Sequence, residues 1–394
     1  MRVPLLPVLC VLLVGVLLDC YIYRRMRHAG VRRGWLWVYV AVAIVVSGAL
    51  LCVDLWPKKS AGDSSLLVLM WALFTYISVY LPKLVFALVS LVQQLLGRLF
   101  RRRLRGIAIA GGVFAFAMFA LMWWGALFNR FNIQINEVEV PIAGLPPAFD
   151  GYRIVQVSDI HSGTYGTDTT FLDKLVNCVN SRQADMIVFT GDIVNRHSEE
   201  LLPFMSVLGR MQAPDGVLSV MGNHDYGDYY RWPDENAHRA DARNLKAMEG
   251  AMGWRMLNNE NMKVRRGADS LVVIGVENIG DHPFPVYGSL TDAYPDASDS
   301  AVKVLLSHNP AHWVDSISGH RDMNIALTLA GHTHAMQIEA FGHSPASLRY
   351  PTWGGMYTDS LGRHLYVNIG TGEVGFPARI GATPEVTVFT LRRR

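Results

Sequence analysis

The stretch Tyr152-Arg-Ile-Val-Gln-Val157 is an apolar, β-branched run that ends in the polar residues Ser158-Asp159-Ile160-His161. A short run of this kind predicts a buried strand with polar residues at its carboxyl end. Four later motifs follow apolar runs in the same way: Gly191-Asp192, Gly222-Asn223-His224-Asp225, Ser307-His308-Asn309 and Gly331-His332-Thr333-His334. Open α/β sheets bind ligands in the crevice beyond the carboxyl ends of their strands. We therefore expect the five motifs to meet in one crevice.

The chain around these motifs alternates between short strands and helices. Further strands are predicted at residues 186–190, 217–221, 302–306, 325–329, 365–369 and 386–391, with a hairpin at 263–276. Helices are predicted at 171–182, 199–211 and 235–252, and a long functional loop at 281–300. This alternation predicts one layered α/β domain over residues 151–394. Residues 129–150 are expected to form a linker and a strand that leads into it.

The chain before residue 128 has a different character. Four apolar stretches, at residues 3–23, 35–56, 66–96 and 107–128, each approach the roughly 20 residues that a helix needs to cross a bilayer. We predict an all-α transmembrane domain of about four helices over residues 1–128. The third stretch contains Pro82-Lys83, where a kink is expected, with Lys83 snorkelling or facing neighbouring helices.

The distribution of charge divides the chain at the same place. Residues 1–130 contain 15 basic and 3 acidic residues, for a net charge of +12, whereas residues 131–394 contain 21 and 30, for −9. The whole chain has 394 residues, a net charge of +3 and 51% hydrophobic residues, which excludes a disordered polyelectrolyte. The acidic second part has no basic stripe, so no nucleic-acid partner is expected.

Arginines in two loops predict the orientation of the spans. Positive charge close to span ends is retained on the cytoplasmic side of a membrane. The first and third loops carry Arg24, Arg25, Arg27, Arg32, Arg33, Arg98, Arg101, Arg102, Arg103 and Arg105, whereas the second loop, around Lys58, Lys59 and Asp63, is nearly neutral. We expect a multi-pass protein of the inner (plasma) membrane, with residues 129–394 on the outer, periplasmic or extracellular side. The arginines are also expected to contact anionic membrane lipids.

Each strand-end motif alone is a weak signal, because Asp-x-His and Gly-Asp also occur in ordinary turns. Together the motifs supply carboxylates, imidazoles and an amide oxygen, which is the mixed N/O donor set that two divalent cations need. Imidazole ligands favour Mn, Fe or Zn. Gly191, Gly222 and Gly331 are expected to permit the tight turns that bring the following side chains into one pocket.

This ordered set resembles the calcineurin-like metallophosphoesterase superfamily, over roughly residues 150–391. The resemblance implies a four-layer αββα sandwich, with two sheets between helices, and a dinuclear metal centre. Carried over by position, the ligands of the first metal are Asp159, His161 and His334, those of the second are Asn223, His308 and His332, and Asp192 bridges the two. The resemblance therefore implies a metal-dependent phosphoric ester hydrolase.

The same resemblance implies the catalytic roles. Two cations lower the pKa of a bridging water and neutralise phosphoryl oxygens during in-line attack by metal-bound hydroxide. His224 would face the leaving group and, as imidazolium, protonate the departing oxygen. Asp225 would orient His224.

The expected substrate is a phosphodiester, a phosphomonoester or a lipid-linked diphosphate. The segments His308-Asn-Pro-Ala-His-Trp313 and Gly331-His-Thr-His-Ala-Met-Gln337 look like a membrane-anchored bacterial branch similar to the YkuE-type phosphoesterases. One alternative is an enzyme like UDP-2,3-diacylglucosamine diphosphatase of lipid A synthesis, which the predicted orientation disfavours because that substrate is cytoplasmic. A second alternative is a non-catalytic membrane scaffold or sensor with a structural metal site.

Some residues outside the motifs are weaker candidates. Those that follow His224 could contact substrate, although surface packing is favoured for them: Tyr226, Tyr229, Arg231 and Trp232. Asp281 and His282 open the long loop, where a substrate gate and a solvated turn are equally favoured. Arg379 is expected to hold either a phosphate or a carboxylate.

Overall fold

The computed structural model describes residues 5–55, 62–102, 104–282, 285–296, 299–320 and 323–394. They divide into two compact units, one formed by Met1–Leu127 with Gly375–Ala378 and the other by Phe128–Val374 with Arg379–Arg394. Parts of the predicted span ends and loops lie outside the described residues, namely Val3, Trp56, Lys58, Lys59 and Arg103.

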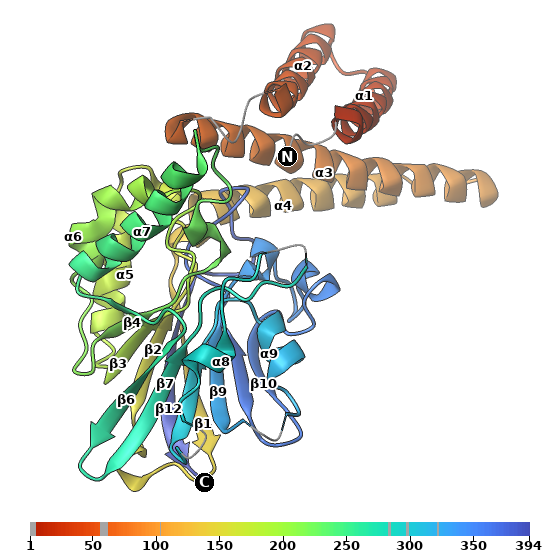
Figure 1. Cartoon of the computed structure of the whole chain (residues 1–394). Helices are drawn as coiled ribbons and strands as arrows, with labels where there is room; N and C mark the ends of the chain where they lie inside the picture. The colour runs from red at the N-terminus through yellow and green to blue at the C-terminus, as the bar shows by residue number, and fades with distance from the viewer. Residues whose placement is uncertain (1–4, 56–61, 103, 283–284, 297–298, 321–322) are drawn as a thin grey trace. The chain divides into compact units, whose positions relative to one another are not determined.

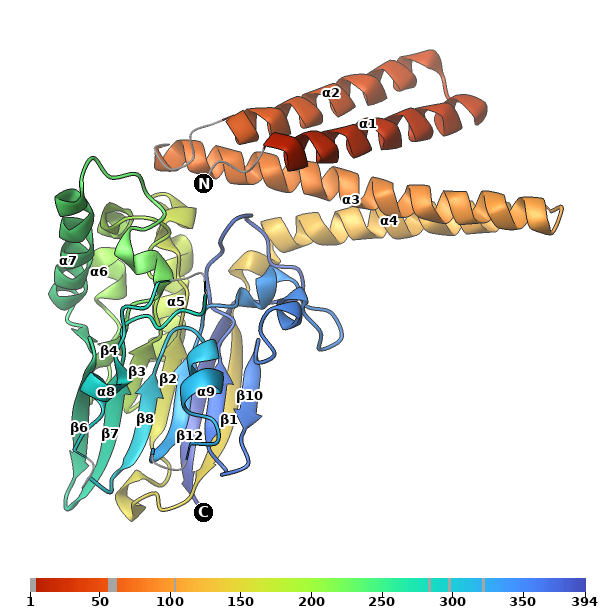
Figure 2. The same cartoon turned by 45° about the vertical axis from the view of Figure 1, so that its right-hand side comes forward.

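The described residues of the first unit form four helices: α1 Leu5–His28, α2 Arg33–Leu55, α3 Asp63–Leu99 and α4 Arg105–Leu127. Among the described residues, three segments combine enough length and hydropathy to cross a bilayer, with mean hydropathies of 1.8 to 2.2: Arg33–Cys52, Asp63–Leu99 and Arg105–Phe131. Helix α3 continues through Pro82 as one element of 37 residues. Within this unit α3 packs against α1, α2 and α4 (Figure 2).

A polar cluster joins three of these helices. Nζ of Lys83 on α3 lies 2.7 Å from a carboxylate oxygen of Asp19 on α1, and both side chains are about 15% exposed or less. The hydroxyls of Tyr39 on α2 and Tyr80 on α3 each donate to the same carboxylate at 2.6 Å. Lys83 therefore faces neighbouring helices and does not snorkel, because its charge is balanced inside the bundle.

The second unit contains two six-stranded mixed sheets (Figure 1). The first has the order β1 Gln134–Ile142, β12 Glu385–Arg393, β2 Arg153–Val157, β3 Met186–Phe189, β4 Val217–Ser219 and β5 Arg255–Met256. The second has the order β10 Gly355–Thr358, β11 His364–Val367, β9 Ile325–Ala330, β8 Val302–Leu306, β7 Asp269–Gly275 and β6 Glu260–Arg266. Strands β2 to β5 run parallel, as do β7, β8, β9 and β11.

The alternation of side chains along the strands produces four layers. On β2, Ile154 joins the core between the two sheets, whereas Val155 packs toward the helices α5 Thr170–Asn180, α6 Met205–Leu208 and α7 Glu235–Ala251. On β8, Leu306 joins the core between the sheets and Leu305 packs toward α8 Leu290–Ala293 and α9 Ala311–Ser316. Successive strand residues point to opposite faces, so both faces of each sheet are buried. The predicted two-sheet α/β fold is confirmed.

Local structure departs from the sequence predictions in several segments. The predicted helix at 199–211 is mostly a 3₁₀ helix, Ser198–Phe204, followed by the single turn of α6; it contains Pro203, which has no amide hydrogen for an α-helical bond. The predicted loop at 281–300 contains α8. Strands β5 and β10, at the edges of the two sheets, were not predicted: β5 has only two residues, and β10 begins at Gly355. The leading segment, 129–150, contains β1, which pairs with β12 along nine residues.

Candidate metal centre

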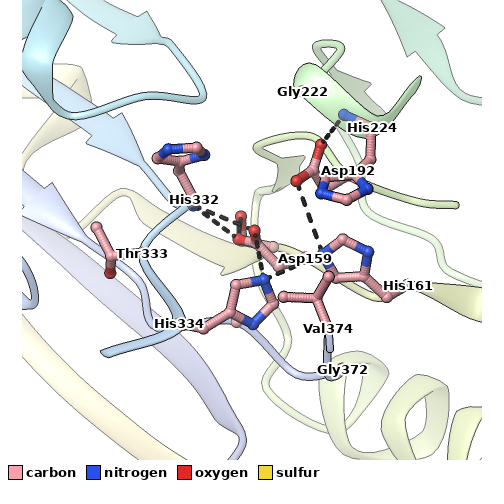
Figure 3. Close-up of polar contacts among 12 residues, drawn as sticks. Asp159, His161, Asp192, Gly222, His224, His332, Thr333, His334, Gly372 and Val374 are labelled. Carbon is pink, nitrogen blue, oxygen red and sulfur yellow. Dashed lines mark hydrogen bonds and ion pairs between the residues drawn. The ribbon is translucent and has the colours of Figure 1, made fainter. Parts of the chain in front are cut away.

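The five sequence motifs meet beyond the carboxyl ends of strands from both sheets. In the first sheet, Asp159 and His161 follow β2, Asp192 follows β3 and Asn223 follows β4. In the second sheet, His308 follows β8, and His332 and His334 follow β9. Figure 3 shows several of these side chains pointing toward one another. The structure therefore brings together all seven residues that were predicted as metal ligands.

The backbone of these loops is strained. Five of the seven candidate ligands have a positive φ: Asp159 (52°), His161 (48°), Asp192 (61°), His332 (78°) and His334 (50°). Such left-handed conformations cost non-glycine residues about 1–2 kcal/mol each, and they cluster at functional sites where the surrounding structure enforces them. Here the amide of Asp159 donates to the carbonyl of Gly191, and that of His161 donates to the carbonyl of Asp192. The two loops thus hold each other in place.

Glycines allow the loops to approach closely. Gly191 has a φ of 96°, as the predicted tight turn requires. Gly222 and Gly331 serve a different purpose from the predicted one. A Cβ on Gly222 would collide with the carboxylate of Asp192, and one on Gly331 would collide with the side chains of Ser158 and Asp159. Both glycines are needed because ligand-bearing loops pass directly against their backbone.

Asp159, His161 and His334 form the first group of donors. The Nε2 atoms of His161 and His334 are 3.0 Å apart, and Nε2 of His334 lies 3.2 Å from Oδ1 of Asp159. One donor atom of each residue lies within 4.8 Å of the others, and all three side chains are buried. Among the described residues, Nδ1 of His161 has no hydrogen-bond partner, although buried polar atoms normally have one.

Asp192, His308 and His332 form the second group, with Asn223 beside it. Nε2 of His308 lies 3.1 Å from a carboxylate oxygen of Asp192 and 3.2 Å from Oδ1 of Asn223. Nδ1 of His332 lies 3.3 Å from the same Nε2. Oδ2 of Asp192 is also 3.7 Å from Nε2 of His161. The carboxylate of Asp192 therefore lies between the two groups of donors.

The two carboxylates of the centre are ionised. Burial by itself would raise their pKa values, but neighbouring imidazoles outweigh it. His334 holds the pKa of Asp159 below its usual range, and His308 holds the pKa of Asp192 well below its usual range. Both side chains thus present the negatively charged oxygens that bind cations.

Two imidazoles of the centre are neutral. Burial lowers the pKa of His161 well below its ordinary value, and the neighbouring His224 and His334 lower it further. Burial also lowers the pKa of His332 to about 3. His308 differs, because the carboxylates of Asp192 and Asp159 outweigh its burial and raise its pKa to about 9. A neutral imidazole is the form that binds a metal.

This donor set fits divalent cations. Imidazole nitrogens face each other at 3.0 and 3.3 Å, so their lone pairs converge on shared space beside two ionised carboxylates. Such a mixture of nitrogen and oxygen donors suits Mn, Fe or Zn.

A hydrogen-bonded chain behind His332 fixes the orientation of its ring. Nε2 of His332 lies 2.9 Å from the hydroxyl of Tyr350, and this hydroxyl donates to Oδ1 of Asp281 at 3.3 Å. Nδ2 of Asn309 donates to the same oxygen at 2.9 Å. When Tyr350 donates to Asp281 it accepts from Nε2 of His332, which leaves Nδ1 as the lone pair facing the centre. Asp281 is thus part of the support of the site, whereas the exposed His282 has no such contact in the described structure.

The predicted pairing of Asp225 with His224 is wrong. The carboxylate of Asp225 accepts from the backbone amides of Gly222, Asp192, Ile193 and Val194 at 2.7 to 3.3 Å. Nδ1 of His224 instead donates to the carbonyl of Asn195 at 2.6 Å, and its amide donates to Asp192 at 2.8 Å. Four adjacent amide donors make a stronger site for a buried carboxylate than one imidazole.

Tyr229 belongs to the site, although sequence reasoning favoured surface packing. Its hydroxyl accepts from Nδ2 of Asn223 at 2.9 Å, which directs the Asn223 carbonyl oxygen toward His308. Its ring stacks on His224 with centroids 4.2 Å apart. No pattern in the sequence distinguishes Tyr229 from the other aromatic residues that follow His224. Tyr226 instead accepts from the amide of Asn278.

Two other weak candidates serve the fold. The indole of Trp232 donates to the carbonyl of Gly227 at 2.8 Å. Arg379 is fully buried; among the described residues its guanidinium donates to the carbonyls of Gly372, Ile369 and Ala382 and lies 3.3 Å from Nδ1 of His334, and no carboxylate accepts from it. The donors of this guanidinium are directed to three backbone carbonyl oxygens, so the predicted carboxylate partner is not found among the described residues.

Two family models match the chain, one for each unit. Residues 152–336 match the calcineurin-like phosphoesterase family. Residues 1–130 match a family described as the transmembrane domain of a probable calcineurin-like phosphoesterase.

Relatives with this domain occur in bacteria and in vertebrates. The uncharacterized metallophosphoesterase YkuE of Bacillus subtilis is 29% identical over 76% of this chain and 97% of its own length. A transmembrane protein with a metallophosphoesterase domain from Danio rerio is 29% identical over 97% of this chain and 87% of its own length. Among solved structures, a dimetal phosphatase from Danio rerio covers 56% of this chain and 88% of that one, at 14% identity and a TM-score of 0.33.

The strand-end donors, the two-sheet fold and the matches to both parts of the chain agree. The chain belongs to the calcineurin-like metallophosphoesterases, which are metal-dependent hydrolases of phosphoric esters, and its catalytic domain follows an N-terminal transmembrane domain.

Proposed function

We propose that this protein uses two divalent cations to hydrolyse a phosphodiester, a phosphomonoester or a lipid-linked diphosphate at the membrane. The observation that carries the proposal is the buried convergence of two donor groups with Asp192 between them. In this proposal Asp159, His161 and His334 would hold the first cation, Asn223, His308 and His332 would hold the second, and Asp192 would contribute to both.

Bound cations would supply positive charge to the phosphoryl oxygens and would activate water. The chain's own residues supply the rest of the chemistry. The hydrogen bond from Nδ1 of His224 to Asn195 leaves Nε2 available to the substrate. In its protonated form His224 donates a proton from Nε2 to the departing oxygen, which removes the cost of expelling an alkoxide. The stacked ring of Tyr229 limits rotation of His224.

The substrate that we favour within this range is lipid-linked. One span suffices to anchor an enzyme, whereas the described residues of the first unit form four helices, three of them long and apolar enough to cross a bilayer. We further propose that the catalytic domain faces the outer side of the membrane. The arginine-rich loops support this orientation, because such loops remain in the cytoplasm.

The catalytic proposal is tested with the detergent-purified full chain loaded with Mn²⁺. We expect hydrolysis of bis-p-nitrophenyl phosphate, p-nitrophenyl phosphate or a short prenyl diphosphate. His224→Ala should lower kcat about 10²- to 10⁴-fold, as loss of a general acid does, with little change in bound metal. The matched control His320→Ala, at an exposed histidine, should keep full activity. Metal binding without hydrolysis of any of these esters would favour the scaffold alternative.

The orientation is tested separately with reporters fused after Arg394. Alkaline phosphatase activity at this position is expected, because the enzyme folds only outside the cytoplasm. Fluorescence of a reporter that matures only in the cytosol would overturn the proposed orientation and would favour a cytosolic nucleotide-linked lipid as substrate.

A further inference from the structure

The first unit contains a polar cavity of its own, of about 450 Å³. It lies where α1 and α3 end and α4 begins. The residues that line it include Arg25, Gln93, Gln94, Arg98, Arg102 and Arg105. Four arginines, from α1, α3, α4 and the loop between α3 and α4, therefore line one open cavity.

The positive charge of this cavity is not balanced by nearby carboxylates. Within the described part of the chain, no carboxylate lies within ion-pair distance of its four arginines. Asp19 is already paired with Lys83 and accepts from two tyrosines. Asp63 is the first residue of α3, at the far end of that helix from Arg98. Four like charges around one cavity repel each other, so an anion that binds between them relieves this repulsion.

Other groups at the cavity complement a phosphate with attached hydroxyls. Helix α4 begins at Arg105, and the amides at the start of a helix favour an anion. Oε1 of Gln93 is a buried acceptor without a partner among the described residues. Nε2 of Gln94 donates to Tyr21 at 2.6 Å and to the carbonyl of Ser90 at 3.1 Å, which leaves its own carbonyl oxygen as an acceptor.

The surroundings of the cavity favour a lipid over a soluble anion. Leu99, which directly follows Arg98, and Leu95 and Ile109, about one turn from Arg98 and Arg105, are 65 to 70% exposed. These helices are long and apolar enough to cross a bilayer, so their ends lie at the depth of the lipid head groups. A lipid whose head group enters the cavity can lay its acyl chains along these leucine and isoleucine side chains.

We infer that this cavity binds the head group of an anionic phospholipid, with the phosphate held by Arg25, Arg98, Arg102 and Arg105. The carbonyl oxygen of Gln94, and that of Gln93 once its side chain turns toward the cavity, accept hydrogen bonds from head-group hydroxyls, as phosphatidylglycerol offers. Planar guanidinium groups bind phosphate oxygens in pairs, and basic pockets between membrane helices bind anionic head groups. This site is independent of the catalytic centre.

The test uses the full chain in nanodiscs and native mass spectrometry. Phosphatidylglycerol should remain bound where phosphatidylcholine with the same acyl chains does not. The triple variant R98Q/R102Q/R105Q should weaken retention about tenfold or more, because each arginine near the lipid adds to the attraction. The matched control R32Q/R33Q/R101Q removes the same charge from positions that do not line the cavity, and should retain the lipid.

Two further variants test the site. R98K/R102K/R105K preserves the charge but removes the paired donors of the guanidinium groups. Its retention of phosphatidylglycerol should lie between that of the parent and that of R98Q/R102Q/R105Q, which separates the loss of paired donors from poor folding of the glutamine variant. Gln93→Leu should reduce the preference for phosphatidylglycerol over phosphatidic acid, which lacks head-group hydroxyls. Equal losses in both glutamine triples, or equal retention of phosphatidylcholine, would overturn the site. Soluble glycerol phosphate that binds as tightly as the lipid would overturn its assignment to a lipid.

Discussion

The carboxylate of Asp225 accepts a hydrogen bond from the backbone amide of Asp192 at 2.7 Å, so a residue of one motif holds the backbone of another. Asp225→Asn should loosen the loop that contains Asp192, because one oxygen of the carboxylate becomes an NH₂ group, which cannot accept from the backbone amides. We expect metal affinity to fall about 10- to 100-fold, as it does when supporting groups behind ligands are lost. Metal content after dialysis against graded chelator measures the change. A lower kcat with unchanged metal affinity would contradict this supporting role and would indicate that Asp225 acts on His224, as the sequence predicted.

Tyr350→Phe should disturb the metal centre through His332. The variant removes the hydroxyl that lies 2.9 Å from Nε2 of His332, so the ring is free to rotate or to change tautomer. A loss of about tenfold or more in metal affinity is expected. Tyr357→Phe on β10 makes the same exchange outside the centre and serves as the control. Equal affinities of both variants would show that Asp281 and Tyr350 do not orient His332.

Metal affinity should depend on pH through His308. The carboxylates of Asp192 and Asp159 raise the pKa of His308 to about 9 despite its burial, so a proton competes with the metal below this pH. Affinity for Mn²⁺ should rise by up to about tenfold per pH unit toward pH 9 and then level off. Titration calorimetry at pH 6 to 9 in buffers of different ionisation enthalpy would detect the released proton. An affinity that does not change over this range contradicts the assignment.

The same proton affects the stability of the metal-free protein, with the opposite trend. The folded-state pKa of His308 lies above its unfolded value of 6.5. Its stabilising contribution is therefore fully present below pH 6.5 and is lost as pH rises through about 9. Metal-free His308→Asn should lack this part of the pH dependence in thermal unfolding.

Glu249 should make the folded domain less stable at alkaline pH. This α7 side chain is fully buried and accepts from Ser219 at 2.5 Å. Burial, aided by the charge of Asp225, raises its pKa to about 8, so its neutral form is favoured. The stability of the folded domain that depends on neutral Glu249 is complete below about pH 4.5 and is lost as pH rises through about 8. Glu249→Gln should abolish this loss, on the order of a few kcal/mol. The fall in Tm between pH 5 and pH 8.5 should therefore be larger for the parent than for Glu249→Gln.

The pair of Asp19 and Lys83 should be essential for packing of the membrane helices. Asp19→Asn or Lys83→Met each leaves one charge buried without its partner, which destabilises proteins by about 3–5 kcal/mol. The double variant should lose less than the two single variants combined, because no charge is left unpaired. Thermal unfolding in detergent, followed by tyrosine and tryptophan fluorescence, measures this coupling. Strictly additive losses would show that the ion pair contributes little.

The chemical identity of the site could be predicted because strand geometry is local. An apolar strand followed by Asp159 or His308 places these side chains at a strand end, and parallel strands align such ends at one edge. The donor types then limit the ligands to divalent cations. All of this depends on residues that are close together in the sequence.

The supporting contacts could not be predicted because they depend on loops. Asp225 adjoins His224 in sequence, yet the turn after β4 directs its carboxylate back to amides that follow β3. Tyr350 reaches His332 through an irregular segment with no periodic pattern. Arg379 was predicted to bind an anion because of its charge. Its partners in the fold are backbone carbonyls, which every residue carries and which a sequence therefore does not reveal. Tertiary folding decides such contacts, and motif spacing does not encode them.

The position of β12 sets the order in which the protein can mature during synthesis. Strand β12 comes last among the strands in sequence, but it lies between β1 and β2, and β2 carries the loop with Asp159 and His161. The helices of the first unit are made long before residues 385–393, and domains generally fold in the order of their synthesis. The first sheet cannot close until β12 has left the ribosome. We therefore expect insertion of the helices into the membrane to precede assembly of the metal centre, which has to wait until residues 385–393 have been made.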